Sequence, residues 1–239
     1  MVTEYLLPGS ADEAAAQREG AVLMAGGTTV MPAVLDGSLR ETRVVGLARA
    51  GLDGISRSGG RTTIGACTTL AAASSLGGAV GAAAAAVGGP ALRNMATVGG
   101  NVVIGGDVAC ALLALDATVD LGSRDVPLAD LWRDLGEDIV RSVSFNDDGG
   151  VFVRWARRAA NSPVVVCVAV AGGRVAVGGV GEHPVRSAGA EAHIDDPEAA
   201  GRAAAAEVDP PTDGIASGWY RKRMTEVFVR RALEAWHAV

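Results

Sequence analysis

The sequence is poor in the residues that build metal sites and disulfide frameworks. Its 239 residues include three cysteines and three histidines, and no two cysteines form a Cys-x-x-Cys pair. Cys67, Cys110 and Cys167 are widely spaced, which argues against zinc sites, iron–sulfur clusters and disulfide pairing. We therefore predict that the chain has no metal site and that its cysteines are small buried side chains.

Excess positive charge and long apolar runs are absent as well. The formal net charge is −6, and the first ten residues contain no Lys or Arg. Apolar runs such as residues 164–171 are much shorter than the roughly 20 residues that a membrane helix needs. These features predict a cytoplasmic protein without a signal peptide, a membrane span or a nucleic-acid partner.

Sequence signatures of several common nucleotide-binding and hydrolytic sites are also missing. The chain contains no GxxxxGK(S/T) loop, no GxGxxG fingerprint, no GxSxG elbow and no HExxH motif. Residues 178–183, GGVGEH, come nearest to GxGxxG, but they end a predicted strand instead of opening a helix. A P-loop and a Rossmann dinucleotide site are therefore disfavoured.

The pattern of elements divides the chain at a polar break, residues 146–150. Residues 1–50 read as β-α-β-α-β, with Ser10 as the N-cap of the first helix. After the break, the sequence alternates as antiparallel strands do, and Gly172-Gly173 predicts a hairpin. A long amphipathic helix is predicted within residues 211–236.

Two glycine-rich turns remain as candidate phosphate-binding loops. The first, residues 25–29 (AGGTT), lies between predicted strand 21–24 and a predicted helix. Consecutive glycines can turn successive N–H groups toward an anion, and the hydroxyls and the helix N-terminus add to the attraction. Such a turn also occurs for structural reasons alone, so this loop by itself does not identify a ligand.

The second turn is residues 94–101 (NMATVGGN). Its paired glycines let backbone amides touch a ligand, while Thr97 adds a hydroxyl and Asn101 an amide. Downstream, Asp107 offers an acceptor for a ribose hydroxyl. Upstream, Arg93 either neutralises a phosphate or caps the preceding helix. Together the two loops suggest a ligand with two phosphates.

The loop sequences AGGTT and RNMATVGGN (93–101) closely resemble the FAD-binding medium subunit of molybdenum hydroxylases, the family of xanthine dehydrogenase and aerobic carbon monoxide dehydrogenase. The resemblance extends over nearly the whole chain. It includes TTIGACTTLAA at 62–72, GGVGEHPVR at 178–186 and WYRKRMTEVFVRRALEA at 219–235.

This resemblance implies an α+β fold. A two-lobed FAD-binding domain of the vanillyl-alcohol-oxidase-like (PCMH) type would occupy residues 1–145, with lobes of about 1–55 and 56–145. A small C-terminal domain of antiparallel sheet plus helices would occupy residues 150–239. FAD would lie extended between the two lobes, and the C-terminal domain would cover one side of the isoalloxazine.

The resemblance also implies where the cofactor is held, without assigning a catalytic residue. A basic residue, Arg154 or Arg157, would stabilise negative charge on N1 of the reduced flavin. The implied FAD-binding residues are Ala25, Gly26, Gly27, Thr28 and Thr29 at the pyrophosphate, Thr97, Gly99, Gly100 and Asn101 at phosphate and flavin, Asp107 on the ribose or adenine side, and Arg154 near the ring.

The chain departs from the family in three places. Thr29 stands where many relatives have an acidic residue, Gly105-Gly106-Asp107 replaces a longer segment, and the C-terminal half is short. We expect the adenine side of the site and the contacts with an iron–sulfur partner to differ accordingly.

The implied function is electron transfer. The chain would pass electrons from the 2Fe–2S clusters of a small subunit, through FAD, to NAD, oxygen or quinone, in a heterohexamer with a molybdopterin large subunit. One alternative is a free-standing FAD-dependent oxidase or dehydrogenase, with His183 or Glu182 as a base. Another is a binding module whose FAD site is empty.

Overall fold

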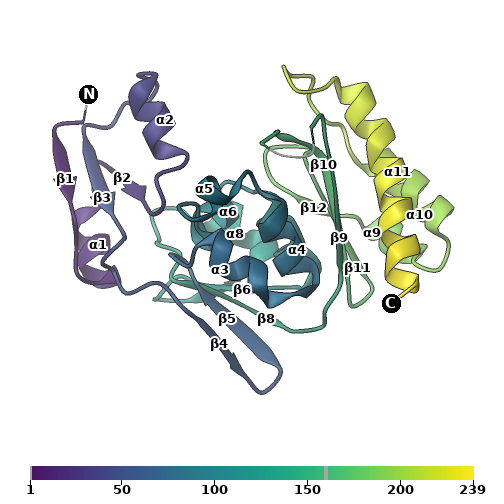
Figure 1. Cartoon of the computed structure of the whole chain (residues 1–239), viewed down its shortest axis with the longest axis horizontal. Coiled ribbons are helices and arrows are strands. Elements are labelled where there is room, and N and C mark those ends of the chain that lie inside the picture. The colour runs from purple at the N-terminus through teal and green to yellow at the C-terminus, as the bar shows by residue number, and fades with distance from the viewer. Residues whose placement is uncertain (1, 159–160) are drawn as a thin grey trace.

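The described residues, 2–158 and 161–239 of this computed structural model, form three β-sheets that follow one another along the chain (Figure 1). The first sheet is parallel and the other two are antiparallel. Helices pack on each sheet, which confirms the α+β class. No described helix is both long enough and apolar enough to cross a membrane.

The N-terminal unit is a parallel sheet in the order β1-β3-β2 with two short helices. Its order along the chain confirms the predicted β-α-β-α-β pattern. The Ser10 hydroxyl accepts from the N–H of Glu13 and caps the first helix, as predicted. The elements are β1 (Glu4–Leu6), α1 (Ala11–Gln17), β2 (Ala21–Met24), α2 (Val30–Leu35) and β3 (Arg43–Gly46).

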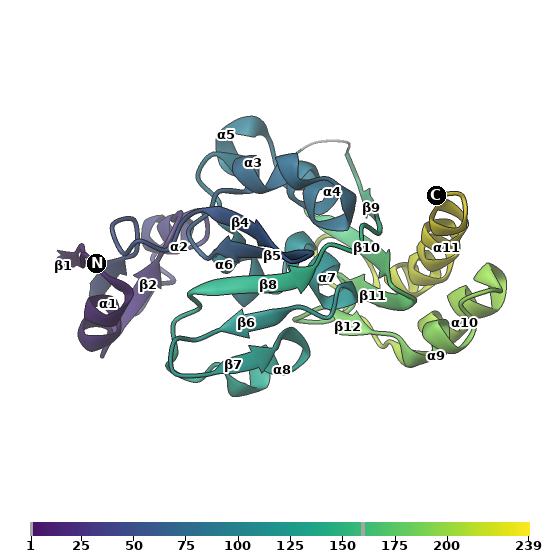
Figure 2. The same cartoon turned by 90° about the horizontal axis from the view of Figure 1, so that it is seen from below.

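The middle unit has an antiparallel sheet in the order β4-β5-β8-β6-β7, and Figures 1 and 2 show its helices gathered against the sheet. Every residue of α7 is buried, so this helix is the centre of the core. The elements are β4 (Ile55–Ser58), β5 (Arg61–Gly65), α3 (Leu70–Ala73), a 3-10 turn (Ser74–Leu76), α4 (Gly78–Ala86), α5 (Pro90–Arg93), α6 (Val98–Val103), α7 (Asp107–Ala114), β6 (Thr118–Asp120), β7 (Asp125–Pro127), α8 (Leu128–Asp134) and β8 (Ser142–Asn146).

The C-terminal unit is an antiparallel sheet in the order β12-β11-β10-β9, with α10 and α11 on its outer face (Figure 1). The predicted hairpin is confirmed, because Gly172 and Gly173 turn the chain with φ of +52° and +76°. The elements are β9 (Val151–Ala156), β10 (Val164–Ala171), β11 (Arg174–Gly178), β12 (Val185–Arg186), α9 (Ala188–Ala192), α10 (Pro197–Glu207) and α11 (Gly218–His237).

Strand β10 joins two hydrophobic cores because its side chains alternate between the two faces of the sheet. Its small residues Cys167, Ala169 and Ala171 belong to the same buried cluster as α4 and α7. Its valines, such as Val168, pack with α10 and α11 in a second cluster. The inner face of the C-terminal sheet is therefore seated directly on the middle unit.

Candidate functional site

The first glycine loop leaves a row of backbone donors available. It connects β2 to α2, and the N–H groups of residues 26–29 have no backbone acceptor among the described residues. Gly27 adopts φ of +72°, which a residue with a side chain rarely tolerates. Thr29 is exposed, and its hydroxyl makes no cap bond to α2. The loop thus presents successive amide hydrogens to whatever lies against it.

Some residues of the second loop stabilise its fold, and others remain exposed at the surface. Thr97 caps α6 by accepting from the N–H of Gly100 at 3.2 Å. The N–H of Gly99 donates to the carbonyl of Ala66 at 2.8 Å, and a Cβ on Gly99 would lie 2.6 Å from that of Ala66. Gly99 is therefore needed for packing, whereas Gly100 is the exposed glycine of the pair.

The two loops touch each other. A Cβ built on Gly26 would lie 1.8 Å from the carbonyl oxygen of Met95 and 2.7 Å from its carbonyl carbon. Real Cβ atoms do not approach that closely, so only glycine lets the first loop reach the second. This contact brings the two predicted phosphate loops to one place on the surface.

Asn101 extends the second loop toward helix α7. Its Oδ1 accepts from the N–H of Val108 at 2.9 Å and, more weakly, from that of Ala109 at 3.4 Å. The N-cap residue of α7, Gly106, makes no side-chain cap bond, so Asn101 caps this helix from a distance. The two N–H donors of the Asn101 side-chain amide remain available for another partner.

Two residues that were expected to meet the cofactor separately form a buried ion pair. The Nε of Arg154 donates to Oδ2 of Asp107 at 2.7 Å, and only 14% and 6% of their side chains are exposed. Burial raises the pKa of Asp107, and the neighbouring guanidinium opposes that rise. The side chain of Cys167 also lowers the pKa of this carboxyl, and the Cys110 thiol donates to the carbonyl of Ala176 at 3.5 Å.

Two other candidates have structural partners. Arg93 donates to the carbonyls of Val87 and Gly88, at 3.2 and 2.9 Å, and so caps the preceding helix, one of its two expected roles. His183 stacks on Trp132, with ring centroids 4.7 Å apart and planes 8° apart. Its Nδ1 is buried without a partner in the described chain. This packing does not favour His183 as a base facing a substrate.

Apolar surface beside the loops was not predicted from the sequence. Met95 in the second loop is 57% exposed, and Val103 and Ile104, just after the loop, are 39% and 51% exposed. A hollow of about 390 Å³ adjoins the first loop and is lined by side chains including Met24 and Val30, which stand immediately before and after it. These side chains give the polar loops apolar neighbours, as a flat ring system requires.

No grouping of three or more potential metal-ligating side chains occurs in residues 2–158 and 161–239. Of the cysteines, Cys110 and Cys167 are buried together, and Cys67 is half-buried elsewhere. The donor set of the site is therefore made of backbone amides, hydroxyls, one amide side chain and one guanidinium.

Two family models match the chain. Residues 1–145 match the FAD binding domain in molybdopterin dehydrogenase, and residues 154–236 match the CO dehydrogenase flavoprotein C-terminal domain. No curated protein matches the chain in sequence.

Solved structures share the fold over nearly the full length. A carbon monoxide dehydrogenase from Hydrogenophaga pseudoflava that lacks the Mo-pyranopterin moiety matches with a TM-score of 0.91 and 24% identity, over 100% of this chain and 98% of that one. Reconstituted CO dehydrogenase from Oligotropha carboxidovorans gives 0.87 and 23%, over 98% and 97%. Quinoline 2-oxidoreductase from Pseudomonas putida 86 gives 0.84 and 22%, over 98% and 96%.

Proposed function

The chain belongs to the family of FAD-binding domains in molybdopterin dehydrogenases, and we propose that it is the electron-transfer subunit of a molybdenum-containing hydroxylase. FAD is the cofactor of this family. In the proposed role, electrons arrive from 2Fe–2S clusters of a small subunit and leave from FAD to NAD, oxygen or quinone. A molybdopterin large subunit would oxidise the substrate.

The contact between Gly26 and the carbonyl of Met95 is the observation that carries the proposal. It joins a loop with unpaired amide hydrogens to a loop with an exposed glycine, Gly100. A diphosphate needs several convergent donors and a close backbone approach, and these two loops supply both. The donors and the absent side chains therefore fit the pyrophosphate of FAD.

The surroundings of the loops support an orientation for the cofactor. The apolar hollow beside the first loop suits the flat adenine ring, with Met24 and Val30 against it. Asn101, Asp107 and Arg154 lie beyond the second loop, on the side of the C-terminal unit. We therefore place Asp107 near the isoalloxazine end, not at the adenine, and retain Arg154 as the basic residue near the ring.

FAD can accept electrons one at a time and donate two together. This property suits a junction between one-electron clusters and a two-electron acceptor. The protein's own contribution is binding and electrostatics. Residues 26–29 would neutralise the diphosphate through their unpaired amide hydrogens, and Gly100, whose own N–H donates to Thr97, would let the diphosphate approach the second loop closely. Arg154 would place positive charge where the reduced ring carries negative charge, which favours the reduced form. No side chain need act as acid or base in the electron transfer itself.

The sequence also supports the need for partner subunits. A pair of 2Fe–2S clusters uses eight ligands, typically cysteines at about four per cluster, whereas this chain has three cysteines. Related structures come from complexes named as carbon monoxide dehydrogenase and quinoline 2-oxidoreductase. We therefore propose an iron–sulfur small subunit and a molybdopterin large subunit as partners, assembled as a heterohexamer.

Titration of the purified chain with FAD tests the binding part of the proposal. We expect one FAD to bind per chain, as measured by quenching of flavin fluorescence. The protein should remain yellow after free cofactor is removed. A colourless protein that takes up no FAD from an excess would overturn the assignment.

Co-purification from the native host tests the electron-transfer part. We expect iron, molybdenum and flavin in one complex, and reduction of FAD only when the partner subunits are present. Reduction of the isolated flavoprotein by a small substrate would instead establish the free-standing oxidase or dehydrogenase.

A further inference from the structure

The Asp107–Arg154 ion pair crosses between the two parts of the chain that build the proposed flavin site. Asp107 is the first residue of α7, in the middle unit, and Arg154 is on β9, in the C-terminal unit. Both side chains are largely buried at their 2.7 Å contact. The pair therefore sits inside the joint between the units and not on its rim.

The guanidinium of Arg154 is fixed in orientation by two contacts. Its Nε donates to Oδ2 of Asp107, and its Nη2 donates to the carbonyl of Ser162 at 2.6 Å. Because a guanidinium is planar and rigid, two bonds on different nitrogens determine where the third nitrogen points. Among the described residues, Nη1 makes no hydrogen bond.

The carboxylate is in turn fixed relative to the second glycine loop. Asn101, from that loop, accepts from the N–H groups of Val108 and Ala109, which follow Asp107 directly. A Cβ on Gly106 would lie within 2.7 Å of the Asn101 side chain, so the turn before Asp107 is packed tightly against the loop. Movement of the loop and movement of the carboxylate are thereby linked.

We propose that Asp107 is a positioning residue: it does not bind FAD itself but holds Arg154, from the other domain, in the orientation that stabilises the reduced flavin. The inference rests on the proposed function and deepens it. Asp107 would then not contact the cofactor but would orient Arg154, which does.

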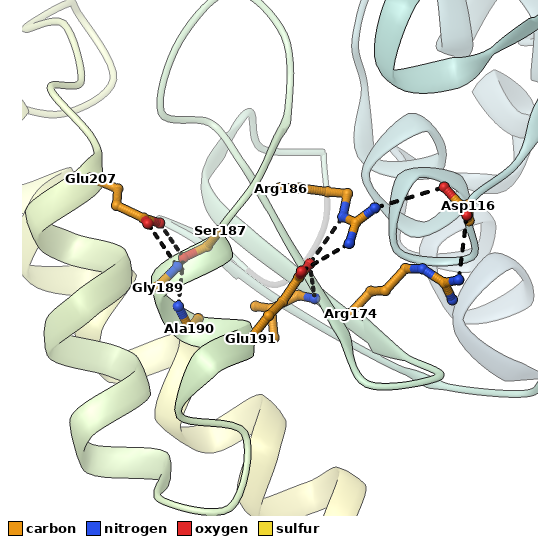
Figure 3. Close-up of polar contacts among 9 residues, drawn as sticks. Asp116, Arg174, Arg186, Ser187, Gly189, Ala190, Glu191 and Glu207 are labelled. Atoms are coloured by element: carbon orange, nitrogen blue, oxygen red, sulfur yellow. Dashed lines mark hydrogen bonds and ion pairs between the residues drawn. The ribbon is translucent and has the colours of Figure 1, made fainter.

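Seating of the C-terminal unit does not by itself require this pair. Just beyond the C-terminal end of α7, Asp116 already ties the middle unit to the C-terminal unit, because it pairs with Arg174 at 3.3 Å and Arg186 at 3.7 Å (Figure 3). Arg186 is also held by both oxygens of Glu191. These groups are much more exposed than Asp107, and a buried ion pair is seldom the cheapest way to join two surfaces. A purely structural role therefore leaves the buried pair unexplained.

The test compares the affinity of the full chain for reduced and oxidised FAD, which the flavin midpoint potential reports directly. We expect Asp107→Ala to lower the preference for reduced FAD about tenfold, which is about 30 mV for a two-electron couple. Arg154→Ala should lower the preference equally. The double variant should show no larger change than either single variant, since each substitution already disrupts the same ion pair. Asp107→Asn keeps an acceptor and should give an intermediate value.

The sign of the change separates positioning from charge neutralisation. If Asp107 only offset the charge of Arg154, then Asp107→Ala and Asp107→Asn would both raise the preference for reduced FAD. A rise, or no change, in both variants would overturn the inference. Asp116→Asn, just beyond the C-terminal end of α7, is the matched control and should leave the potential unchanged; a drop equal to that of Asp107→Ala would also overturn the inference, by showing that domain seating alone is responsible.

Failure of the inference is distinguishable from failure of the proposed function. If the wild-type chain takes up no FAD, the proposed function fails. If the wild-type and variants bind oxidised FAD alike, and their potentials agree, only the positioning role of Asp107 is wrong. A variant that does not fold is recognised by far-ultraviolet circular dichroism, and Asp107→Asn, which keeps the shape of the side chain, then decides the outcome.

Discussion

Gly26 is the residue at which the two loops depend most directly on a missing side chain. We expect Gly26→Ala to force the loops apart, because the added carbon would lie 1.8 Å from the carbonyl of Met95. The free energy of unfolding should fall by about 1–3 kcal/mol, as in other overpacked sites, and FAD affinity should fall at least about tenfold. Thermal denaturation and fluorescence titration measure the two effects.

Gly214→Ala is the matched control for that substitution. A Cβ at Gly214 would meet no atom within 4 Å. This variant should keep both stability and FAD affinity. Equal losses in the two variants would show that the close approach of Gly26 to Met95 is not what matters.

The cysteines make a second prediction at the residue scale. Burial, with a smaller contribution from Asp53, raises the pKa of Cys67 to about 11. The hydrogen bond to Cys110 and burial raise the pKa of Cys167 well above that of an ordinary thiol. Because the thiolate is the reactive form, the two thiols should react with a disulfide reagent only slowly near pH 8.

A thiol titration checks this expectation. Two units of pKa correspond to about 100-fold less thiolate at Cys67, so its reaction rate should climb steeply toward pH 11. Denaturant should release all three cysteines of the sequence at once. Rapid reaction of the native chain at pH 8 would contradict the burial of these groups.

Among the elements, β10 determines how closely the C-terminal unit approaches the middle one. Cys167, Ala169 and Ala171 form its small-residue face against the core that contains α7. We expect Ala169→Leu to push the sheet away from α7, with a loss of about 1–3 kcal/mol in the free energy of unfolding. Arg154 lies on β9, opposite Cys167 of β10. Displacement of β10 should therefore move Arg154 and shift the flavin potential as well.

Urea unfolding of Ala169→Leu and Val168→Ile provides the comparison. Val168 faces the opposite core, with α10 and α11, and gains only one methylene in this variant. Its cost should be smaller, and the flavin potential should stay at the wild-type value. If the potential shifts equally in both variants, close packing of β10 on α7 does not control the ring environment.

Helix α11 is anchored by a different charged pair. Arg221 is buried in its first turn and donates to the carbonyls of Val165 and Gly179 and to both oxygens of Asp213. The backbone N–H groups of Ala216 and Ile215, followed by Arg221, lower the pKa of Asp213 to about 2. The charged carboxylate of Asp213 thus accepts hydrogen bonds from the loop that precedes α11.

The lowered pKa predicts how acid affects Asp213→Asn. The folded pKa lies below the ordinary value, so the stabilisation is complete above about pH 5 and is lost as the pH falls through about 2. The difference in free energy of unfolding between wild type and variant should therefore shrink on acidification. Urea unfolding at a series of pH values measures it, and a difference independent of pH would contradict the assignment.

On the scale of the whole molecule, the N-terminal unit lies at one end of the structure (Figure 1), and its small core, which includes Val45 and Ala14, also takes in Ile139 of the middle unit. Its first glycine loop contacts the second at Gly26, and Asp12 pairs with Arg141 of the middle unit. FAD bound across both loops should therefore stabilise this unit most. At 100 times its dissociation constant, the cofactor should add about 2.7 kcal/mol to the free energy of unfolding.

Hydrogen exchange locates that stabilisation. We expect FAD to slow exchange of the unpaired amides of residues 26–29 and also of the exposed Gly100 amide, which already donates to Thr97, since the diphosphate would cover both loops. Riboflavin, which lacks the diphosphate, is the control and should protect neither loop to the same degree. Protection of only one loop by FAD would show that the cofactor does not bridge them.

The sequence by itself determined the features that depend on neighbours along the chain. Ser10 capping α1, the Gly172-Gly173 hairpin and the strand–loop–helix around residues 25–29 follow from local backbone preferences, and the two loop motifs sufficed for the family. Helices α9 and α10 were not predicted, although local signals for them were present: Ser187 and Asp196 are N-caps that accept from the first turns, and Pro197 stands at the first position of α10.

Only the tertiary structure decided which distant residues meet. It brought Gly26 to Met95, paired Asp107 with Arg154, used Gly99 for packing on Ala66, and set Cys110 beside Cys167. Side-chain contacts across sheets and between units depend on how whole elements pack, and nothing in the spacing of residues along a chain encodes that distance. The two glycine loops could therefore be recognised from the sequence in advance, whereas the distant residues that they contact could not.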